Sequence, residues 1–341
     1  AVTLKGAKGK TINIKPSSVT PTITPQPTVT PVTTPSSNVI YGTSGNDYLI
    51  NAASRYSIKS GISIYGYAGN DTITNKGNNV YMSGGSGNDS IKSTNAASNV
   101  TIHGDDGHDN INVSGNNARI YGEKGNDYIY NYGDCALIEG GDDKDTISSW
   151  GDNTSIYGGA GDDSIGVTGS MNYSRNAFLS GGSGNDTIIT QAGVGVSIAG
   201  NSGNDYIKIE TSKASCVIAY NSGDGYDTVV GFDGNDTLKV YGNYTRSTVG
   251  NDVVVKVGSG SITLKNAKNN TINISGGNLS SSADLASDLI SADDTNFVND
   301  GANLSSIVDS GAIDYSVGKL NPFENVTSLT QKSALMTFAK K

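Results

Sequence analysis

Apolar positions in the central part of the chain recur at two fixed offsets from an aspartate. In the regular copies this aspartate is Asp47, Asp71, Asp89, Asp109, Asp127, Asp145, Asp163, Asp186 and Asp205. The apolar residue seven positions before it is Ile40, Ile64, Met82, Ile102, Ile120, Ile138, Ile156, Leu179 and Ile198 in turn. The one two positions after it is Leu49, Ile73, Ile91, Ile111, Ile129, Ile147, Ile165, Ile188 and Ile207. Since polar residues alternate with these positions, each copy predicts two short half-buried strands.

The distance between successive copies predicts a stack of like units. From Asp47 to an irregular copy at Asp227 the aspartates are 24, 18, 20, 18, 18, 18, 23, 19 and 22 residues apart. An 18-residue unit with insertions of zero to six residues explains every spacing. A fixed internal period of this kind is typical of a solenoid, in which neighbouring units bury one another's apolar faces.

The segment between the two predicted strands has the composition of a metal-binding turn, as in residues 104–109. Glycines stand five and two positions before the aspartate, and we expect both to take positive φ and to turn their carbonyls to one side. Carbonyl and carboxylate oxygens suit Ca²⁺, which takes six to eight oxygen ligands. One turn has too few of them, but two turns stacked about 4.8 Å apart have enough. Each ion is therefore predicted to lie between successive coils.

The predicted ligands are the aspartates and the glycines five positions before them. They are Gly42, Asp47, Gly66, Asp71, Gly84, Asp89, Gly104, Asp109, Gly122, Asp127, Gly140, Asp145, Gly158, Asp163, Gly181, Asp186, Gly200 and Asp205, together with Asp227 and Asp236, which stand nine residues apart. At Asp145 the second glycine is replaced by Asp143, which predicts the weakest site.

These turns resemble the G-G-x-G-x-D-x-U-x nonapeptide of the RTX (repeats-in-toxin, hemolysin-type) family. Good matches are S-G-G-S-G-N-D-T-I at 180–188 and Y-G-G-A-G-D-D-S-I at 157–165. The resemblance implies an all-β fold, a right-handed parallel β-roll (β-solenoid) of about ten 18-residue coils with calcium in its turns. The tightest family members repeat the nonapeptide every nine residues. Here a plain polar turn such as residues 75–79 alternates with it, so we expect a single file of about eight calcium ions.

The changes in composition along the chain predict five regions. They are an N-terminal hairpin (1–15), a Pro/Thr-rich extended linker (16–38), the calcium-binding roll (39–240), a β capping element with a hairpin around Gly258 (241–276), and a C-terminal helical tail whose first helix starts near Ser282 (277–341). The cap resembles the element that ends many RTX rolls. The tail is similar to the uncleaved C-terminal signals of RTX proteins exported by type I secretion. The alternative is an ordinary helical or interaction tail.

The N-terminal hairpin has a second copy in the cap. Residues 1–14 and 261–274 are identical at nine of fourteen positions. Residues 1–14 are either the end of an upstream module or a donor strand that adds to the edge of another subunit. The linker contains six of the seven prolines and has an extended length of about 70 Å, enough to span a roll of about 50 Å.

Composition and charge favour folding that depends on calcium. The chain contains 45 Gly, 5 Phe and 1 Trp, and its formal net charge is −9. So few large side chains cannot form a thick core, and a ladder of carboxylates repels itself until cations bind. The alternative is that the acidic surface only maintains solubility. Cys135 and Cys216 fall on different coils, which excludes a disulfide between them, and Cys216 is expected in the core.

Catalytic motifs are absent from the sequence, so we expect no enzyme activity. No H-E-x-x-H or G-x-S-x-G motif occurs. His103 and His108 fall in one predicted turn, and because no further nitrogen or sulfur ligand for zinc is evident, both are interpreted as substitutions on a solvated turn. Outward tyrosines such as Tyr65 and Tyr121 either bind glycans or ice or are simply good strand formers.

The leading functional hypothesis is a secreted calcium-binding structural or adhesive protein of a bacterial cell surface. In this hypothesis it folds on export and self-assembles through residues 1–15 and the 241–276 cap, with a type I exporter as the partner of its tail. The alternative is the C-terminal folding and export module of a larger secreted enzyme or toxin. No nucleic acid partner is expected, and the sequence contains no run of 18 apolar residues for a membrane span.

Overall fold

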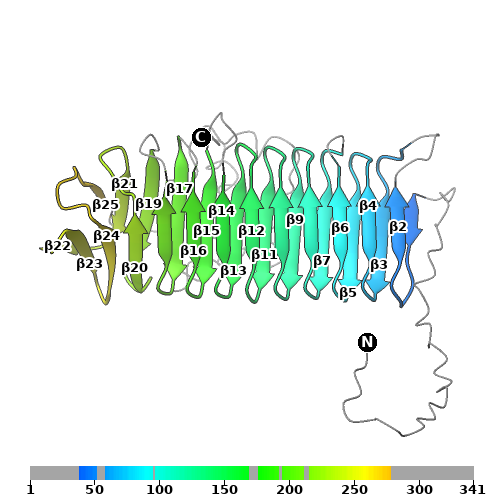
Figure 1. The fold of residues 1–341 in the computed structure, drawn as a ribbon, viewed down its shortest axis with the longest axis horizontal. Coiled ribbons are helices and arrows are strands. Elements are labelled where there is room, and N and C mark those ends of the chain that lie inside the picture. Colours follow the sequence, from blue (N-terminus) through cyan, green and yellow to red (C-terminus); the bar gives the residue numbers. More distant parts are fainter. Residues whose placement is uncertain are drawn as a thin grey trace, which may run out of the picture.

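The protein is a two-sheet β-solenoid in a computed structural model that describes residues 38–51, 58–94, 97–168, 176–191, 194–210 and 215–277 (Figure 1). All regular structure in these residues is β-strand. The first sheet contains, in spatial order, β1 (Val39–Tyr41), β3 (Ser63–Ala68), β5 (Tyr81–Ser86), β7 (Thr101–Asp106), β9 (Arg119–Lys124), β11 (Leu137–Asp142), β13 (Ser155–Ala160), β15 (Phe178–Ser183), β17 (Val196–Ser202), β19 (Cys216–Asn221), β21 (Thr237–Tyr241) and β25 (Asn273–Gly277). The second contains β2 (Tyr48–Asn51), β4 (Thr72–Asn75), β6 (Ser90–Ser93), β8 (Asn110–Val113), β10 (Tyr128–Asn131), β12 (Thr146–Ser149), β14 (Ser164–Val167), β16 (Thr187–Thr190), β18 (Tyr206–Ile209), β20 (Tyr226–Val230), β24 (Gly260–Lys265), β23 (Asp252–Val257) and β22 (Tyr244–Val249).

The chain alternates between the two sheets, so each coil adds one strand to each. Neighbouring strands of the roll are parallel and in register, with Ile120 of β9 opposite Ile138 of β11 and Ile129 of β10 opposite Ile147 of β12. Where the sequence has an insertion, the pairing absorbs it, as in the pair Ile40 and Ile64. The predicted all-β parallel roll with one coil per repeat is confirmed.

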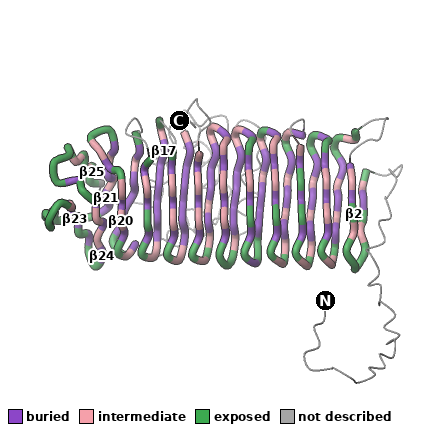
Figure 2. Tube along the Cα trace, viewed as in Figure 1, coloured by how far each residue is buried: buried purple, intermediate pink, exposed green. Residues whose placement is uncertain are grey.

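The core is a narrow apolar layer between the two sheets, and buried positions recur along every coil of the roll (Figure 2). Both predicted apolar positions of every regular copy face inward, and all eighteen side chains are at most 3% exposed. Because the layer is filled mainly by one isoleucine from each strand, each coil has little apolar area of its own and is stabilised by its neighbours. Cys216 is 1% exposed in this core, as expected, and neither cysteine forms a disulfide.

The C-terminal end of the roll is closed by a cap in which strand direction changes. Strands β22, β23 and β24 form an antiparallel meander, and the predicted hairpin turns at Gly258, where φ is +56°. Phe232 and three valines of β23 are buried beneath it. Strand β24 pairs in parallel with β20, and β25 pairs in parallel with β21. Residues 261–274 therefore form a strand in each sheet, joined by a turn, and make the last coil of the roll.

Several predicted regions lie outside the described residues. They are the N-terminal hairpin 1–15, nearly all of the 16–38 linker, and the 277–341 tail beyond its first residue, with the helix near Ser282. In the part of the chain that the structure describes, no helix is long and apolar enough to cross a membrane.

Candidate metal centre

The predicted metal-binding turns all lie along one edge of the roll, where the chain passes from the first sheet to the second. In each regular coil the aspartate is the residue before the strand of the second sheet, as Asp127 is before β10. Its side chain points inward, and from Asp71 to Asp227 these side chains are between 0 and 3% exposed. Carboxylates are rarely buried to this degree without a partner.

One oxygen of each aspartate links two coils. The Oδ1 atom accepts a hydrogen bond from the backbone amide of the equivalent aspartate in the preceding coil, as Asp127 Oδ1 does from Asp109 N at 2.7 Å. The ladder is continuous. Its donors and acceptors are Asp47 and Asp71, Asp71 and Asp89, Asp89 and Asp109, Asp109 and Asp127, Asp127 and Asp145, Asp145 and Asp163, Asp163 and Asp186, Asp186 and Asp205, and Asp205 and Asp227, at 2.7 to 3.0 Å.

The other oxygen of the central aspartates has no protein partner. The Oδ2 atoms of Asp71, Asp89, Asp109, Asp127, Asp145, Asp163, Asp186 and Asp205 are buried and accept no hydrogen bond. At the N-terminal end, Asp47 Oδ2 instead accepts from the backbone amide and the hydroxyl of Thr43, at 2.5 and 2.9 Å. Eight buried carboxylate oxygens in one line are therefore left for a ligand, since leaving each without one costs about 1 to 3 kcal/mol or more.

The positions five residues before the aspartates require glycine because a side chain there would collide with its surroundings. The expectation that these glycines take positive φ was wrong. None of them, for example Gly122, has positive φ. A Cβ at Gly122 would lie 2.4 Å from Asp127 Oδ2 and 2.4 Å from the carbonyl oxygen of Gly140 in the next coil. The unpaired carboxylate oxygen and a backbone carbonyl of the neighbouring coil thus converge on the glycine, and any side chain would fill the place where they meet.

From the Asp71 copy onward, positive φ occurs two positions before the aspartate, as predicted, and also four positions before it. At the first position Gly125 has φ +114° and Asp143 has +74°, so Asp143 adopts the left-handed conformation expected of the replaced glycine. At the second position the residue is glycine in several coils, such as Gly141 with φ +122°, but Asp105 and Glu123 take φ of +73° and +77° there. The sequence analysis did not identify this second position.

Burial raises the pKa of these aspartates, and neighbouring carboxylates raise it further. The pKa of Asp109 is raised to about 8, by burial first and then by the charges of Asp127 and Asp89, against a backbone hydrogen bond that lowers it. The pKa of Asp145 reaches about 9 for the same reasons, and that of Asp71, near the end of the file, about 6. A cation bound among these groups would therefore bind in competition with protons.

The donor set fits calcium. The converging groups are carboxylate and carbonyl oxygens from two stacked turns, with no nitrogen or sulfur atom among them. Calcium is the divalent ion that accepts such an all-oxygen set with flexible geometry. The candidate ligands of the nine regular copies are all brought together along this edge, each aspartate against the glycine of its own turn.

The irregular end of the file differs from the prediction. Asp227 completes the ladder, but Asp236 does not join it, because nine residues is half a coil and places Asp236 at the opposite edge, between β20 and β21. Its two oxygens accept backbone amides of Cys216 and Asp233, both at 2.9 Å. Sequence reasoning missed Asp224, which lies in the turn before Asp227, is 3% exposed, and accepts from the amide of Asn221 at 2.6 Å.

The two histidines occupy different places. His108 is on the solvated turn, as predicted, where its Nδ1 accepts from the amide of Asn126 at 2.7 Å, just as Asn88 accepts from the amide of His108 at 2.9 Å. His103 is not on the turn, because strand β7 continues through Asp106. It lies on the outer face of the first sheet with its side chain only 21% exposed.

The opposite edge, where the chain returns from the second sheet to the first, is closed in the regular coils by amides, and the carboxylate of Asp236 lies beyond them near the cap. Asn131 is fully buried, its Nδ2 donates to Gly133 O at 2.7 Å and to Ser149 Oγ at 3.0 Å, and its Oδ1 accepts from Gly133 N at 3.2 Å. Asn51 and Asn75 are linked in the same way, at 2.8 Å. We call this the plain edge and the aspartate side the calcium edge.

Comparison with known proteins identifies the repeats. The profile of the RTX calcium-binding nonapeptide repeat (four copies) matches residues 32–51, 63–80, 103–133, 137–165, 173–194 and 221–239. Among solved structures, the extracellular lipase LipA from Serratia marcescens is similar, with 17% sequence identity and a TM-score of 0.27, over 60% of this chain and 40% of the lipase chain. No curated protein matches the chain.

Proposed function

We propose that this chain, which belongs to the family of proteins built from RTX calcium-binding nonapeptide repeats, is a secreted structural protein that folds when it meets extracellular calcium and then associates with its own kind. Proteins with this repeat bind calcium and are typically secreted. The bacterial cell surface, the adhesive role and the absence of enzyme activity are parts of the proposal. The lack of catalytic motifs in the sequence supports the last of these.

One observation carries the calcium-dependent folding: the file of eight buried Oδ2 atoms without a protein partner. At neutral pH, calcium ions between successive turns would neutralise these carboxylates and give each unpaired oxygen a ligand, with about eight ions in the file. Because each ion would touch two coils, binding and stacking are the same event, and the binding free energy becomes folding free energy. Low calcium before export would keep the chain unfolded, which is the state that an exporter requires.

Circular dichroism and calcium counting test this part of the proposal. In about 5 mM Ca²⁺, a concentration above the affinities of extracellular sites, we expect a β spectrum and about eight bound ions per chain. In chelator at pH 7.5 the β spectrum should be lost. Magnesium is the control, because its small octahedral shell retains water and should not restore the fold. A β spectrum that is unchanged in chelator would contradict the proposal.

Self-association is supported by the edges of the two sheets. Among the strands that the structure describes, β1 pairs only with β3 and β2 only with β4, so these two strands end their sheets. The 261–274 segment, which makes the last coil, has a near copy at residues 1–14. A segment with this sequence in one molecule is suited to add a strand to each sheet of another, and main-chain hydrogen bonds would hold it there.

Deletion of residues 1–15 tests this association. By light scattering and electron microscopy in 5 mM Ca²⁺, the full chain should form ordered multimers and the deletion variant should remain monomeric with the same β spectrum. Equal assembly of the two would overturn the donor-strand hypothesis without affecting the calcium hypothesis.

The same copy favours the second candidate function, a folding and export module of a larger secreted enzyme or toxin. Since residues 261–274 close a roll, residues 1–14 have the sequence expected at the end of another roll upstream. A gene that encodes a catalytic region before Ala1, combined with a chain that stays monomeric in calcium, would decide for this candidate.

A further inference from the structure

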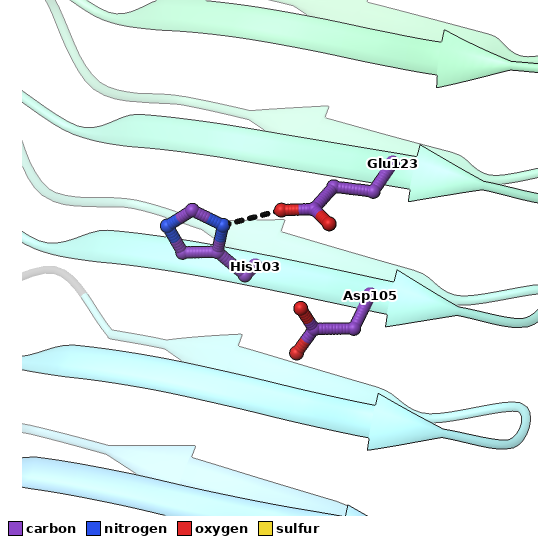
Figure 3. Close-up of side chains that lie close together, drawn as sticks. All are labelled: His103, Asp105 and Glu123. Carbon is purple, nitrogen blue, oxygen red and sulfur yellow. Dashed lines mark hydrogen bonds and ion pairs between the residues drawn. The ribbon is translucent and has the colours of Figure 1, made fainter. Parts of the chain in front are cut away.

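Three side chains with metal-binding atoms gather on the outer face of the first sheet, away from the core. His103 and Asp105 lie two residues apart on β7, and Glu123 lies on β9, directly opposite Asp105 in the register. Their ligand atoms all lie within 4.8 Å of one another. Figure 3 shows the Glu123 carboxylate turned toward the His103 ring with the Asp105 carboxylate beside them. We call these three residues the His103 cluster.

Each member of the cluster is held by a neighbour. The His103 ring lies between Tyr81 and Tyr121, with ring centroids 5.3 and 4.7 Å away, and its Nδ1 lies 2.6 Å from Glu123 Oε1. Asp105 Oδ2 accepts a hydrogen bond from the hydroxyl of Ser83. The ring plane and both carboxylates are therefore oriented before any ion arrives, which lowers the cost of forming a site.

A fourth carboxylate, Glu139, provides an independent sign of a missing ligand. Glu139 lies on β11 opposite Tyr121 and is only 5% exposed, yet its Oε1 accepts no hydrogen bond. Burial first, and the nearby charge of Glu123 second, raise its pKa to about 9. A buried carboxyl with an unpaired oxygen beside a second carboxylate indicates a position where a cation belongs.

The lysine that follows Glu123 in the chain forms its ion pair outside the cluster. The Nζ atom of Lys124 pairs with Asp106 Oδ1 at 3.1 Å. Asp105 and Glu123 also keep left-handed backbone angles at a position where most other coils have glycine, at a cost of the order of 1 kcal/mol each. Two successive coils thus carry carboxylates where the fold favours none.

We infer that His103, Asp105 and Glu123 bind one divalent transition-metal ion such as Zn²⁺, with Glu139 as a further carboxylate partner, at a site separate from the calcium file. An imidazole nitrogen combined with carboxylates selects zinc or a similar ion over calcium, which takes oxygen alone. Bonds of about 2.0 to 2.2 Å require the ligand atoms to close to separations near 3.5 Å. When the ion binds Nδ1, the proton between His103 Nδ1 and Glu123 is exchanged through solvent for one on Nε2, so the imidazole stays neutral.

Isothermal titration with Zn²⁺ tests the site on the full chain in 5 mM Ca²⁺. We expect one zinc ion per chain from the cluster, and a loss of at least tenfold in its affinity in His103→Tyr and in Glu123→Gln. Tyrosine occupies the equivalent position in the next coil, at Tyr121, and two coils before, at Tyr65, so His103→Tyr retains the aromatic stack with Tyr81 and Tyr121. The matched control is His108→Asn, which removes the other histidine but restores the asparagine found at that position in adjacent coils, and its zinc affinity should equal that of the unchanged protein.

Two results would overturn the inference. One is equal zinc affinity in His103→Tyr and His108→Asn. The other is zinc binding that disappears when Ca²⁺ is raised to about 20 mM, since zinc would then be entering the calcium file. The chain has only two histidines, so NMR of the imidazole nitrogens in the unchanged protein gives a readout that needs no variant to fold. The His103 signals should shift on adding Zn²⁺ while those of His108 stay in place, and unshifted His103 signals would contradict the site.

Discussion

The two edges of the roll solve one problem, the closing of a turn in a narrow solenoid, by opposite means. At the plain edge of the regular coils the buried polar side chains are amides and hydroxyls that bind one another and the local backbone, as Asn131 does. At the calcium edge they are carboxylates, each with one oxygen bound to the preceding coil and one oxygen without a protein partner. The amides of the plain edge find partners within the chain, whereas eight carboxylate oxygens of the calcium edge are left for cations. Folding can therefore be controlled through one edge without disturbing the other.

The same difference appears in the lengths of the turns. The aspartate and its two flanking apolar positions keep constant offsets in all nine regular copies, so every insertion falls at the plain edge. An aspartate must reach both the amide of the preceding coil and the glycine of its own turn, and a longer turn would break these contacts. The amide turns have no such constraint across several coils.

The largest expected effect comes from titrating the calcium edge in chelator. The carboxyl pKa values of the folded roll, about 6 for Asp71 and about 9 for Asp145, exceed the usual unfolded value near 4. The folded calcium-free chain therefore binds more protons than the unfolded chain, and its stability rises as pH falls from about 9 toward 4. We expect the β spectrum lost in chelator at pH 8 to return in large part at pH 5. The same unfolded spectrum at both values would contradict this prediction.

The second largest effect is expected from insertions of equal length, which should be harmful at the calcium edge and tolerated at the plain edge. Two glycines added after Lys124 lengthen a calcium turn, displace Asp127 from both of its neighbours, and should remove about two bound ions with a fall in Tm of about 10 °C or more. Two glycines added after Tyr132 lengthen the plain turn of the same coil, at the position where the chain already has two extra residues before Ala97. Because loop closure changes little with length, this control should melt within a few degrees of the original protein. Equal losses would mean that both edges are fixed in length.

Single substitutions of two fully buried residues, one at each edge, should give a smaller difference between the edges. Asp127→Asn keeps an acceptor for the Asp109 amide but removes the charge, so one to two fewer calcium ions should bind and Tm should fall by several degrees. Asn131→Ser introduces the residue that the plain edge has at Ser149, and should cost about 1 kcal/mol without changing the ion count. Ion counting by mass spectrometry and melting in 5 mM Ca²⁺ measure both. A changed ion count in Asn131→Ser would disprove the independence of the edges.

The smallest effects are expected from three glycine-to-alanine substitutions. They distinguish a loss of space in the fold from a change in the geometry of the calcium ligands. Gly122→Ala places a methyl group 2.4 Å from Asp127 Oδ2, so it should weaken calcium binding and cost about 1 to 3 kcal/mol. Gly133→Ala at the plain edge meets a backbone oxygen at 2.0 Å and should destabilise by a similar amount with calcium binding intact. Gly166→Ala, in strand β14 with no atom nearer than 3.8 Å, is the neutral control, within about 0.5 kcal/mol. Thermal melts at two calcium concentrations separate the three.

Much of this architecture could be predicted from the sequence because isoleucines and aspartates recur at constant offsets in each repeat. Ile120 and Ile129 face the core because strand alternation leaves no other choice, and Asp127 follows from its constant offset to them. The purpose of Gly122 could not be predicted, since glycine serves positive φ and close approach equally well, and only the positions of Asp127 and of the next coil distinguish them. Asp236 was misplaced because its nine-residue spacing imitates the tightest RTX repeat.

The His103 cluster shows a different limit of sequence reading. Asp105 and Glu123 stand at the same offset from their aspartates, so the sequence already placed them side by side. The cluster was not predicted because the turn motif treats the positions of Asp105 and Glu123 as equivalent glycine sites, whichever residue occupies them. A comparison of outward positions from coil to coil, and not only of inward ones, would have found it.

Because all extra residues lie at the plain edge, the roll is a scaffold with insertion sites at regular intervals along its axis. Each coil offers one place where a peptide can be grafted, and successive places are about 4.8 Å apart along a straight axis. Epitopes, enzymes or mineral-nucleating sequences inserted at chosen coils would be displayed at spacings set by counting coils, and withdrawal of calcium would dismantle the display.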